Sequence, residues 1–440
     1  MKTPIVDFLN GFVNSNPTRL HMPGHKGKLG YERDITEVSG ADSLYHADGI
    51  ILESEKNAGE LFGTQCFYSA EGSSLSIRAM LYLALLYARE NGKSEKMLAA
   101  RNVHKSFISA AALLDLDVDF IGFGEDYLSS TLDPNELATT LDAYSEPPLA
   151  VYITTPDYLG RMQDVKKIAE ICHARGILCL CDNAHGAYLA FLEPSMHPIA
   201  LGADMCADSA HKTLPALTGA SYLHLNRNLP SFFAENAKGA LALFGSTSPS
   251  YLILESLDRL NGMLNGEYGS RLKIATELVA DIKSALSSIG YEIIDGEPLK
   301  ITLNASDYGY TGFELGEALE RRNVYPEFYD NDYLVLMVSE SNTERDLHAL
   351  YTVLSRVPKK SKKQIEKAGL SQPKKAMSIR DAMLSPRERI SVDLALGRIL
   401  ADTSVACPPA VPILVPGEIV CEDAVAMFKR YGYNEILVLK

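Results

Sequence analysis

Several features are missing from the sequence, and each absence excludes a class of protein. No apolar run among the 440 residues reaches the roughly 18 that a membrane-spanning helix needs. The N-terminal region also lacks the apolar segment of a secretory signal peptide. Basic residues do not predominate: 56 Asp and Glu oppose 42 Lys and Arg, giving a formal net charge of -14, which argues against nucleic acid or an anionic membrane surface as a partner. We therefore expect a cytoplasmic protein, and the charge mildly favours a cationic substrate.

Signatures of metal, disulfide and nucleotide sites are absent as well. The number of cysteines is odd and none has the paired spacing of zinc ligands, so we expect reduced thiols in the core and no metal site. The sequence contains neither a GxGxxG dinucleotide fingerprint nor a Walker loop, which removes the main support for nicotinamide or nucleoside triphosphate binding. The seven cysteines are at positions 66, 172, 179, 181, 206, 407 and 421.

What is present is an alternation of short apolar runs with helical segments. With 46% hydrophobic residues, a chain of this length can bury one main core and one or two smaller ones. Strands separated by helices of about 10 to 15 residues indicate a mostly parallel sheet covered on both faces. We expect strands at 96–100, 118–123, 149–156, 176–182 and 203–208, an antiparallel edge strand at 222–225, and helices at 77–89, 134–144, 164–175 and, as one long helix, 250–288.

Lys212 is the best candidate for a catalytic amine. It directly follows a histidine and precedes the apolar run that starts at Leu214. A lysine in such surroundings makes sense if its charge is removed, by desolvation or by an imine with a carbonyl cofactor. The alternative, taken on this stretch alone, is an ordinary surface lysine in a turn.

Asp182 favours the catalytic interpretation of Lys212, because it ends an apolar strand shortly before Gly186. Ligands of open α/β sheets bind at the carboxyl ends of the strands. A carboxylate there can pair with a protonated ring nitrogen, as pyridoxal 5'-phosphate (PLP) requires. The 30 residues between Asp182 and Lys212 leave room for one strand, at 203–208, which would return the lysine to the same edge.

A turn of Gly72, Ser73 and Ser74 between a strand and a helix suggests a phosphate cradle. The first backbone N–H groups of a helix are unpaired, and the two hydroxyls add donors. On this stretch alone, an ordinary serine N-cap is equally compatible.

Four stretches together resemble the PLP-dependent ornithine/lysine/arginine decarboxylase family, which has the aspartate aminotransferase-like fold known as fold type I, and within it a short-chain arginine decarboxylase-like member. They are His-Met-Pro-Gly-His-Lys-Gly (21–27), Arg-Asn-Val-His-Lys-Ser (101–106), Asp-Asn-Ala-His-Gly-Ala (182–187) and Ser-Ala-His-Lys-Thr-Leu (209–214). Matching stretches run from about residue 20 to the C-terminus, including Cys-Pro-Pro-Ala-Val-Pro (407–412). The resemblance implies an α/β fold with a seven-stranded type of mostly parallel sheet, a small α+β domain and a C-terminal domain.

The resemblance also implies domain boundaries and roles for residues. It places a PLP-binding major domain with an N-terminal arm at 1–265 and the C-terminal domain at 376–440. Between them, the strand and helix pattern predicts a small α+β domain at 266–357, and the lysine-rich segment 358–375 is expected to be a solvated linker. Lys212 would form the Schiff base with PLP, His104 would stack on the ring, and Asp182 would pair with its nitrogen. His185 would lie near the phenolic oxygen. The phosphate and the remaining cofactor contacts would fall to Gly72, Ser73, Ser74, Ser209, His211 and Thr247, the last of these reaching the cofactor of a neighbouring subunit in a homodimer or higher homo-oligomer.

The implied reaction is decarboxylation of a basic amino acid, with arginine to agmatine first and lysine to cadaverine or ornithine to putrescine next. The cationic tail needs a carboxylate, for which Glu327, Asp330 and Glu418 are candidates, and His25 with Lys26 would lie near the mouth of the site. The proton donor at Cα, Lys212 or a histidine, stays open. The alternatives are another fold type I reaction, such as an aminotransferase or a carbon-sulfur lyase, and a catalytically silent relative.

Three departures from the family pattern lie beside the expected cofactor site. Asn183 stands where a glutamate is usual, Tyr188 where a histidine is common, and Gly219-Ala220 where a glutamine is usual. They bear on the substrate and on the reaction rather than on PLP binding.

Overall fold

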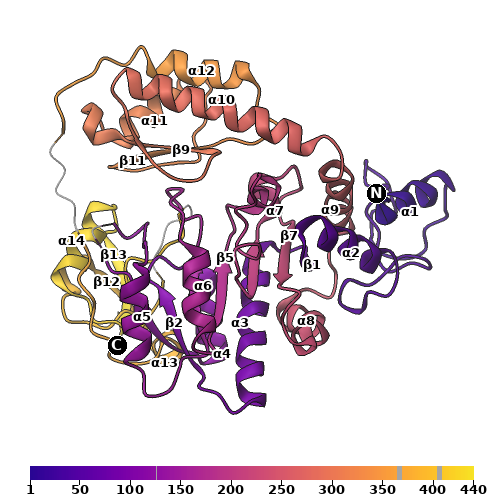
Figure 1. The fold of residues 1–440 in the computed structure, drawn as a ribbon, viewed down its shortest axis with the longest axis horizontal. Helices are drawn as coiled ribbons and strands as arrows, with labels where there is room; N and C mark the ends of the chain where they lie inside the picture. Colours follow the sequence, from indigo (N-terminus) through magenta and orange to yellow (C-terminus); the bar gives the residue numbers. More distant parts are fainter. Residues whose placement is uncertain (125, 364–368, 404–408) are drawn as a thin grey trace. The chain divides into compact units, whose positions relative to one another are not determined.

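The computed structural model describes residues 1–124, 126–363, 369–403 and 409–440 (Figure 1). The chain forms two compact units. The first unit contains residues 1–93 and 165–272, and the second contains residues 94–164 and 273–440. Cys407 and Pro408, which begin the C-terminal family motif, lie outside the described residues. In the part of the chain that is described, no helix is long and apolar enough to cross a membrane.

The first unit contributes four strands to a seven-stranded sheet, in the order β1-β7-β6-β5. Strands β5 and β6 pair in parallel, whereas β7 is antiparallel to both β6 and β1. The strands are β1 (Gln65–Ser69), β5 (Leu178–Asp182), β6 (Met205–Asp208) and β7 (Ser221–Leu225). The helices are α1 (Pro4–Asn14), α2 (Ile50–Phe62), α3 (Gly72–Glu90), α6 (Val165–His173), α7 (Ala210–Thr213), α8 (Ser231–Phe244) and α9 (Tyr251–Leu264), with 3-10 turns at Leu44–His46 and Ala187–Phe191.

The second unit supplies the other three strands, in the order β4-β2-β3, all parallel. They are β2 (Lys96–Ala100), β3 (Asp117–Ile121) and β4 (Ala150–Thr154), connected by α4 (Lys105–Leu114) and α5 (Pro134–Asp142). Helix α5 begins where the sequence predicts, because Pro134 occupies the first turn and Asp133 caps the N–H groups of Asn135 and Glu136. The expectation of a mostly parallel seven-stranded sheet is confirmed.

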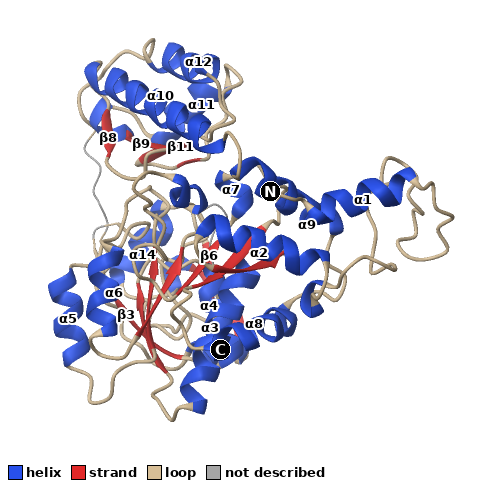
Figure 2. Ribbon diagram, turned by 45° about the vertical axis from the view of Figure 1, so that its right-hand side comes forward, coloured by secondary structure: helices blue, strands red, loops and turns tan. Residues whose placement is uncertain are grey.

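A four-stranded antiparallel sheet in the order β10-β11-β9-β8 forms the centre of a smaller part of the second unit. Helices α10, α11 and α12 lie together on one side of this sheet in both ribbon views (Figure 2). The elements are β8 (Glu292–Ile294), β9 (Lys300–Asn304), β10 (Phe328–Tyr329), β11 (Tyr333–Met337), α10 (Tyr268–Ser288), α11 (Gly312–Glu320), α12 (Glu344–Leu354) and a 3-10 turn at Ala305–Tyr308.

The C-terminal residues build a further small core around a two-stranded antiparallel sheet. It contains α13 (Ile379–Leu384), β12 (Arg387–Ser391), a 3-10 turn at Val392–Leu394, α14 (Glu422–Arg430) and β13 (Glu435–Leu439). Phe428, Ile436 and Val438 are almost completely buried in this core. The domain boundaries that the family resemblance implies stay predictions.

Three sequence expectations were wrong in detail. Helix α3 begins at Gly72 rather than at residue 77, because Gly72, with a φ of +72°, lets the chain turn directly from β1 into the helix. Strand β7 is an interior strand, because both β6 and β1 pair with it. The long helix expected at 250–288 is two helices, α9 and α10, separated by a turn in which the N–H of Gly266 donates to the carbonyl of Met263.

Candidate active site

The first unit brings Lys212 and His185 together. Lys212 lies on α7, the short helix that follows β6, and His185 lies in the loop after β5. The Nζ atom of Lys212 is 3.0 Å from Nε2 of His185. His185 is 6% exposed and Lys212 is half-buried, so the amine is partly shielded from water next to a group that can accept its proton.

Asp182 ends β5, as the sequence predicts, and is 2% exposed. Its Oδ1 accepts the backbone N–H of Ala184 at 3.1 Å, which holds the start of the loop that carries His185. Strands β5 and β6 are parallel neighbours, so their carboxyl ends place Asp182 and the Lys212 helix at one edge of the sheet.

The start of α3 reaches the same group of residues. Ser209, directly before α7, donates its hydroxyl to Oγ of Ser73 at 2.8 Å. The N–H of Gly72 donates to the carbonyl of Gly219 at 2.8 Å, so the helix N-terminus is tied to the loop that precedes β7. A Cβ atom built on Gly72 would have no other heavy atom within 4 Å, so there is open space beside this helix N-terminus.

His211 is held by a backbone contact. Its Nδ1 lies 2.9 Å from the carbonyl oxygen of Ala220, which indicates that Nδ1 carries a proton and donates it. Burial lowers the pKa of His211 below the usual value, because the charged imidazolium is less well solvated there. A neutral ring leaves Nε2 able to accept a hydrogen bond.

Thr247, His25 and Lys26 lie on other loops of the first unit. Thr247 is exposed in the loop between α8 and α9, where the neighbouring Ser246 N–H donates to Glu71. His25 contacts Asp34 at 3.1 Å and accepts the N–H of Gly27, and Lys26 is exposed.

His104 belongs to the second unit, where it caps α4. Its Nδ1 accepts the backbone N–H of Ser106 at 3.1 Å. This contact fixes Nδ1 as an acceptor and leaves the ring half-buried at the carboxyl end of β2. The predicted role of His104 in stacking on the cofactor stays a prediction.

The three candidate carboxylates for a cationic tail have different surroundings. Glu327 is exposed and accepts the hydroxyl of Tyr158 at 3.0 Å. Asp330 is 4% exposed, its Oδ1 accepts the N–H groups of two residues in its own turn, and burial raises its pKa to about 7. Glu418 is 6% exposed and contacts Nη2 of Arg101 at 2.9 Å. Of the three, only Glu327 has an accessible carboxylate.

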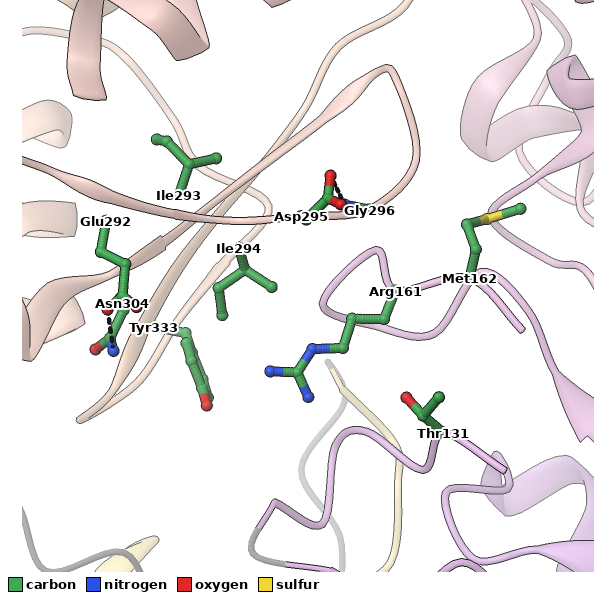
Figure 3. A pocket seen from close by; sticks show the side chains of 10 residues that line it. All are labelled: Thr131, Arg161, Met162, Glu292, Ile293, Ile294, Asp295, Gly296, Asn304 and Tyr333. Atoms are coloured by element: carbon green, nitrogen blue, oxygen red, sulfur yellow. Dashed lines mark hydrogen bonds between the residues drawn. The ribbon is translucent and has the colours of Figure 1, made fainter. Parts of the chain in front are cut away.

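A pocket in the second unit is lined by none of the predicted site residues, although Tyr333 on its wall donates its N–H to Asp330 at 2.7 Å (Figure 3). The guanidinium of Arg161 points into it, and the hydroxyl of Tyr333, on its wall, donates to Asp126 at 2.6 Å. The residues that line it are Thr131, Arg161, Met162, Glu292, Ile293, Ile294, Asp295, Gly296, Asn304 and Tyr333.

Sequence reasoning missed a buried group of polar residues under the Lys212 loop. Asp208 accepts hydrogen bonds from His197 and Asn183 and lies 3.3 Å from Nε2 of His224, and all three partners are at most 1% exposed. One signal was available: like Asp182, Asp208 is an acid at the end of an apolar strand. The two histidines are remote in sequence and carried no such signal.

Comparisons with known proteins find relatives along nearly the whole chain. Residues 3–290 match the family model described as the Orn/Lys/Arg decarboxylase major domain, and residues 360–431 match its C-terminal domain. An arginine decarboxylase of Halalkalibacterium halodurans is 30% identical over 98% of this chain and 93% of its own, and one of Bacillus subtilis is 28% identical over 98% and 94%. The solved constitutive lysine decarboxylase of E. coli superimposes with a TM-score of 0.80 at 18% identity, covering 100% of this chain and 82% of that one.

Proposed function

The chain belongs to the Orn/Lys/Arg decarboxylase family, and we propose that it removes the α-carboxyl group of a basic amino acid with PLP attached to Lys212. The observation that carries this proposal is the contact of 3.0 Å between Lys212 Nζ and His185 Nε2 beside the buried carboxylate of Asp182. Arginine is the first substrate we propose, because relatives that match 98% of the chain are named arginine decarboxylases. Lysine and ornithine come next.

The residues of the first unit fit PLP in the chemistry of their donors and acceptors. Lys212 offers a primary amine for the aldehyde, and Asp182 offers a buried carboxylate for the ring nitrogen. Ser73 and Ser209 offer hydroxyls beside the N-terminus of α3, a helix of 19 residues whose first N–H groups and dipole favour an anion. When bound, PLP supplies an electron sink for the pair of electrons left when carbon dioxide departs.

The chain's own residues would divide the remaining tasks among them. The carboxylate of Asp182 would hold the proton on the ring nitrogen, and His104 would stack on the ring. His185 Nε2 accepts a hydrogen bond from Lys212 Nζ, which orients the amine and lowers the cost of its losing a proton. The proton that replaces the carboxyl group at Cα comes from Lys212 or from a histidine beside it.

The cationic tail of the substrate would be bound by Glu327. Its exposed carboxylate supports this role, whereas the carboxylates of Asp330 and Glu418 are buried and engaged within the fold. We further propose a homodimer or higher homo-oligomer, in which residues 244–251 with Thr247 reach the cofactor of a second copy, as the family resemblance implies.

The test is carbon dioxide release, with the product identified by mass, from purified PLP-loaded protein offered arginine, lysine and ornithine separately. Lys212→Ala serves as the control. Amine formation that disappears in the variant would support the proposal and name the substrate. Failure to release carbon dioxide from any of the three, with PLP bound, would contradict it and leave transamination or carbon-sulfur cleavage to be assayed.

A further inference from the structure

Asp208, the last residue of β6, is the centre of a completely buried polar network. Its Oδ2 accepts Nε2–H of His197 at 3.0 Å and lies 3.3 Å from Nε2 of His224. Its Oδ1 accepts Nδ2–H of Asn183 at 2.8 Å. Each of these four residues is at most 1% exposed, so the carboxylate has exchanged water for protein donors on both oxygens.

The network joins the two loops that carry the predicted cofactor residues. Asn183 directly follows Asp182, and Asp208 directly precedes Ser209. The N–H of Asn183 also donates to the carbonyl of Ala207 at 3.0 Å. The end of β5 and the end of β6 are therefore fastened to each other by one backbone and one side-chain hydrogen bond.

A second branch of the network reaches α3. The carbonyl of Asp208 accepts the hydroxyl of Ser221 at 2.6 Å, and that hydroxyl lies 3.0 Å from Oγ of Ser76, one turn after the start of the helix. The three segments that would hold the ring nitrogen, the aldehyde and the phosphate thus meet at one buried residue, through the carboxylate of Asp208 on one side and its backbone carbonyl on the other.

The histidines and Asp208 could in principle hold a metal ion, because one ligand atom from each lies within 4.8 Å of the others. The tautomer of His197 argues for a hydrogen-bond network instead. The backbone N–H of Ile199 donates to Nδ1 of His197 at 3.3 Å, so Nδ1 is an acceptor and the proton lies on Nε2, the atom that faces Asp208. A metal would need that atom deprotonated.

The identity of residue 183 follows from this geometry. A carboxylate at this position would face that of Asp208 in a completely buried site. Two like charges at hydrogen-bond distance in a buried site cannot both stay ionised. The amide of Asn183 instead donates a hydrogen bond to Asp208. A carboxylate at residue 208 therefore requires a hydrogen-bond donor at residue 183.

We propose that the hydrogen bond between Asn183 and Asp208 positions the two cofactor-binding loops relative to each other. The proposal rests on the function proposed above, in which Asp182 lies on one loop and Lys212 on the other. Asn183 and Asp208 are positioning residues, because they act through their chain neighbours.

Exchanging the two side chains gives the sharpest test. Asn183→Asp alone opposes two carboxylates, whereas Asn183→Asp combined with Asp208→Asn restores the hydrogen bond with its direction reversed. In the double variant the amide oxygen at 208 can still accept from His197 and face His224. Asn226→Asp is the matched control: its Nδ2 donates to the carbonyl of Ala203, at the opposite end of β6.

Two readouts are needed, the affinity of the apoprotein for PLP and the pH midpoint of the visible absorbance of the bound cofactor. The second reports on the groups around Lys212 and would not follow a loss of stability alone. We expect Asn183→Asp to weaken PLP binding at least about tenfold and to shift the midpoint, and the double variant to return to within about threefold of wild type. Asn226→Asp should change neither.

If Asn183→Asp does not fold, Asn183→Ala replaces it, because it removes the donor without adding charge; we expect about three- to tenfold weaker binding. Folded variants at 183 with wild-type affinity and midpoint would overturn the inference, and so would a double variant no better than Asn183→Asp. Wild-type protein that took up no PLP would instead overturn the proposed function, and this inference with it.

Discussion

The Nζ atom of Lys212 and Nε2 of His185 lie 3.0 Å apart, although 27 residues separate them in the sequence. The pair is formed because β5 and β6 are parallel neighbours, each followed at its carboxyl end by one of the two residues. The contact provides a lysine amine with a proton acceptor in a partly buried place, which is what a lysine needs to attack a carbonyl carbon at neutral pH.

Replacing His185 should therefore slow the reaction without releasing PLP. We expect His185→Asn to lower kcat by at least about 100-fold, because Lys212 loses the group that orients it and shares its proton. The visible absorbance of the lysine-bound cofactor should persist in this variant and be absent in Lys212→Ala. His348→Asn, an exposed histidine on α12, is the control. A kcat within about twofold of wild type for His185→Asn would contradict the role of the contact.

Glu327 is expected to affect substrate binding rather than the chemical step. In Glu327→Gln the shape is kept and the charge is lost, so KM for the basic substrate should rise about 10- to 100-fold with kcat little changed. Glu320→Gln is a closely matched control, because Glu320 also accepts a tyrosine hydroxyl, that of Tyr329 at 2.9 Å. Steady-state kinetics of both variants test this prediction. If Glu327→Gln and Glu320→Gln have the same KM, Glu327 does not bind the substrate.

Local structure was predictable wherever a local signal exists. The strand expected at 96–100 is β2 to the residue, and α5 starts at Pro134 because the cap and the proline are adjacent in sequence. The position of β7 between β1 and β6 was not predictable, because strand order depends on pairing between residues more than 100 positions apart. The turn between α9 and α10 was missed because an Asn-Gly pair is a weak signal inside a helical pattern: Asn265-Gly266 forms the turn, whereas Asn261-Gly262 lies within α9.

The candidate site was predictable to a similar degree. Asp182 and Lys212 could be brought to one edge of the sheet from strand order alone, as the structure confirms for the two strands that carry them. The partners of Asp208 could not be identified, because His197 and His224 lie in a loop and in an antiparallel strand that only the fold brings together. The buried partner of Glu418 was missed for the same reason, since Arg101 is 317 residues away.

The pair of Arg101 and Glu418 should behave as a structural ion pair. Both side chains are buried, and the carboxylate also accepts the N–H of Val415 at 2.7 Å. Glu418→Ala leaves the guanidinium without its charge partner and should destabilise the fold by roughly 3–5 kcal/mol. Glu388→Ala, which removes the partner of Arg398 in an exposed pair, should cost less than about 1 kcal/mol.

The free energy of unfolding of Glu418→Ala and of Glu388→Ala is measured with a chemical denaturant. A second measurement separates structure from substrate binding: Glu418→Gln, which retains an acceptor for the guanidinium, should leave KM unchanged. A raised KM with unaltered unfolding would show that the side chain binds substrate after all.

Asp330 should make stability depend on pH in the opposite direction to a salt-bridged aspartate. Burial raises the pKa of its carboxyl to about 7, from 3.8 in the unfolded chain, and Oδ2 lacks a hydrogen-bond partner among the described residues. The folded state therefore binds the proton more tightly than the unfolded state. Its contribution is fully present below about pH 4 and is lost as the pH rises to about 7.

Asp330→Asn should prevent the loss of stability between about pH 4 and pH 7. The amide stays neutral, and its oxygen still accepts the N–H groups of Asp332 and Tyr333. Relative to wild type, the variant should gain stability between pH 4 and pH 7, by up to about 4 kcal/mol, and hold that gain at pH 8. The free energy of unfolding, measured for both proteins at pH 4, 6 and 8, gives the difference directly. A variant less stable than wild type at pH 8 would mean that the carboxylate is ionised and paired in the folded protein, and a raised KM would return Asp330 to the substrate site.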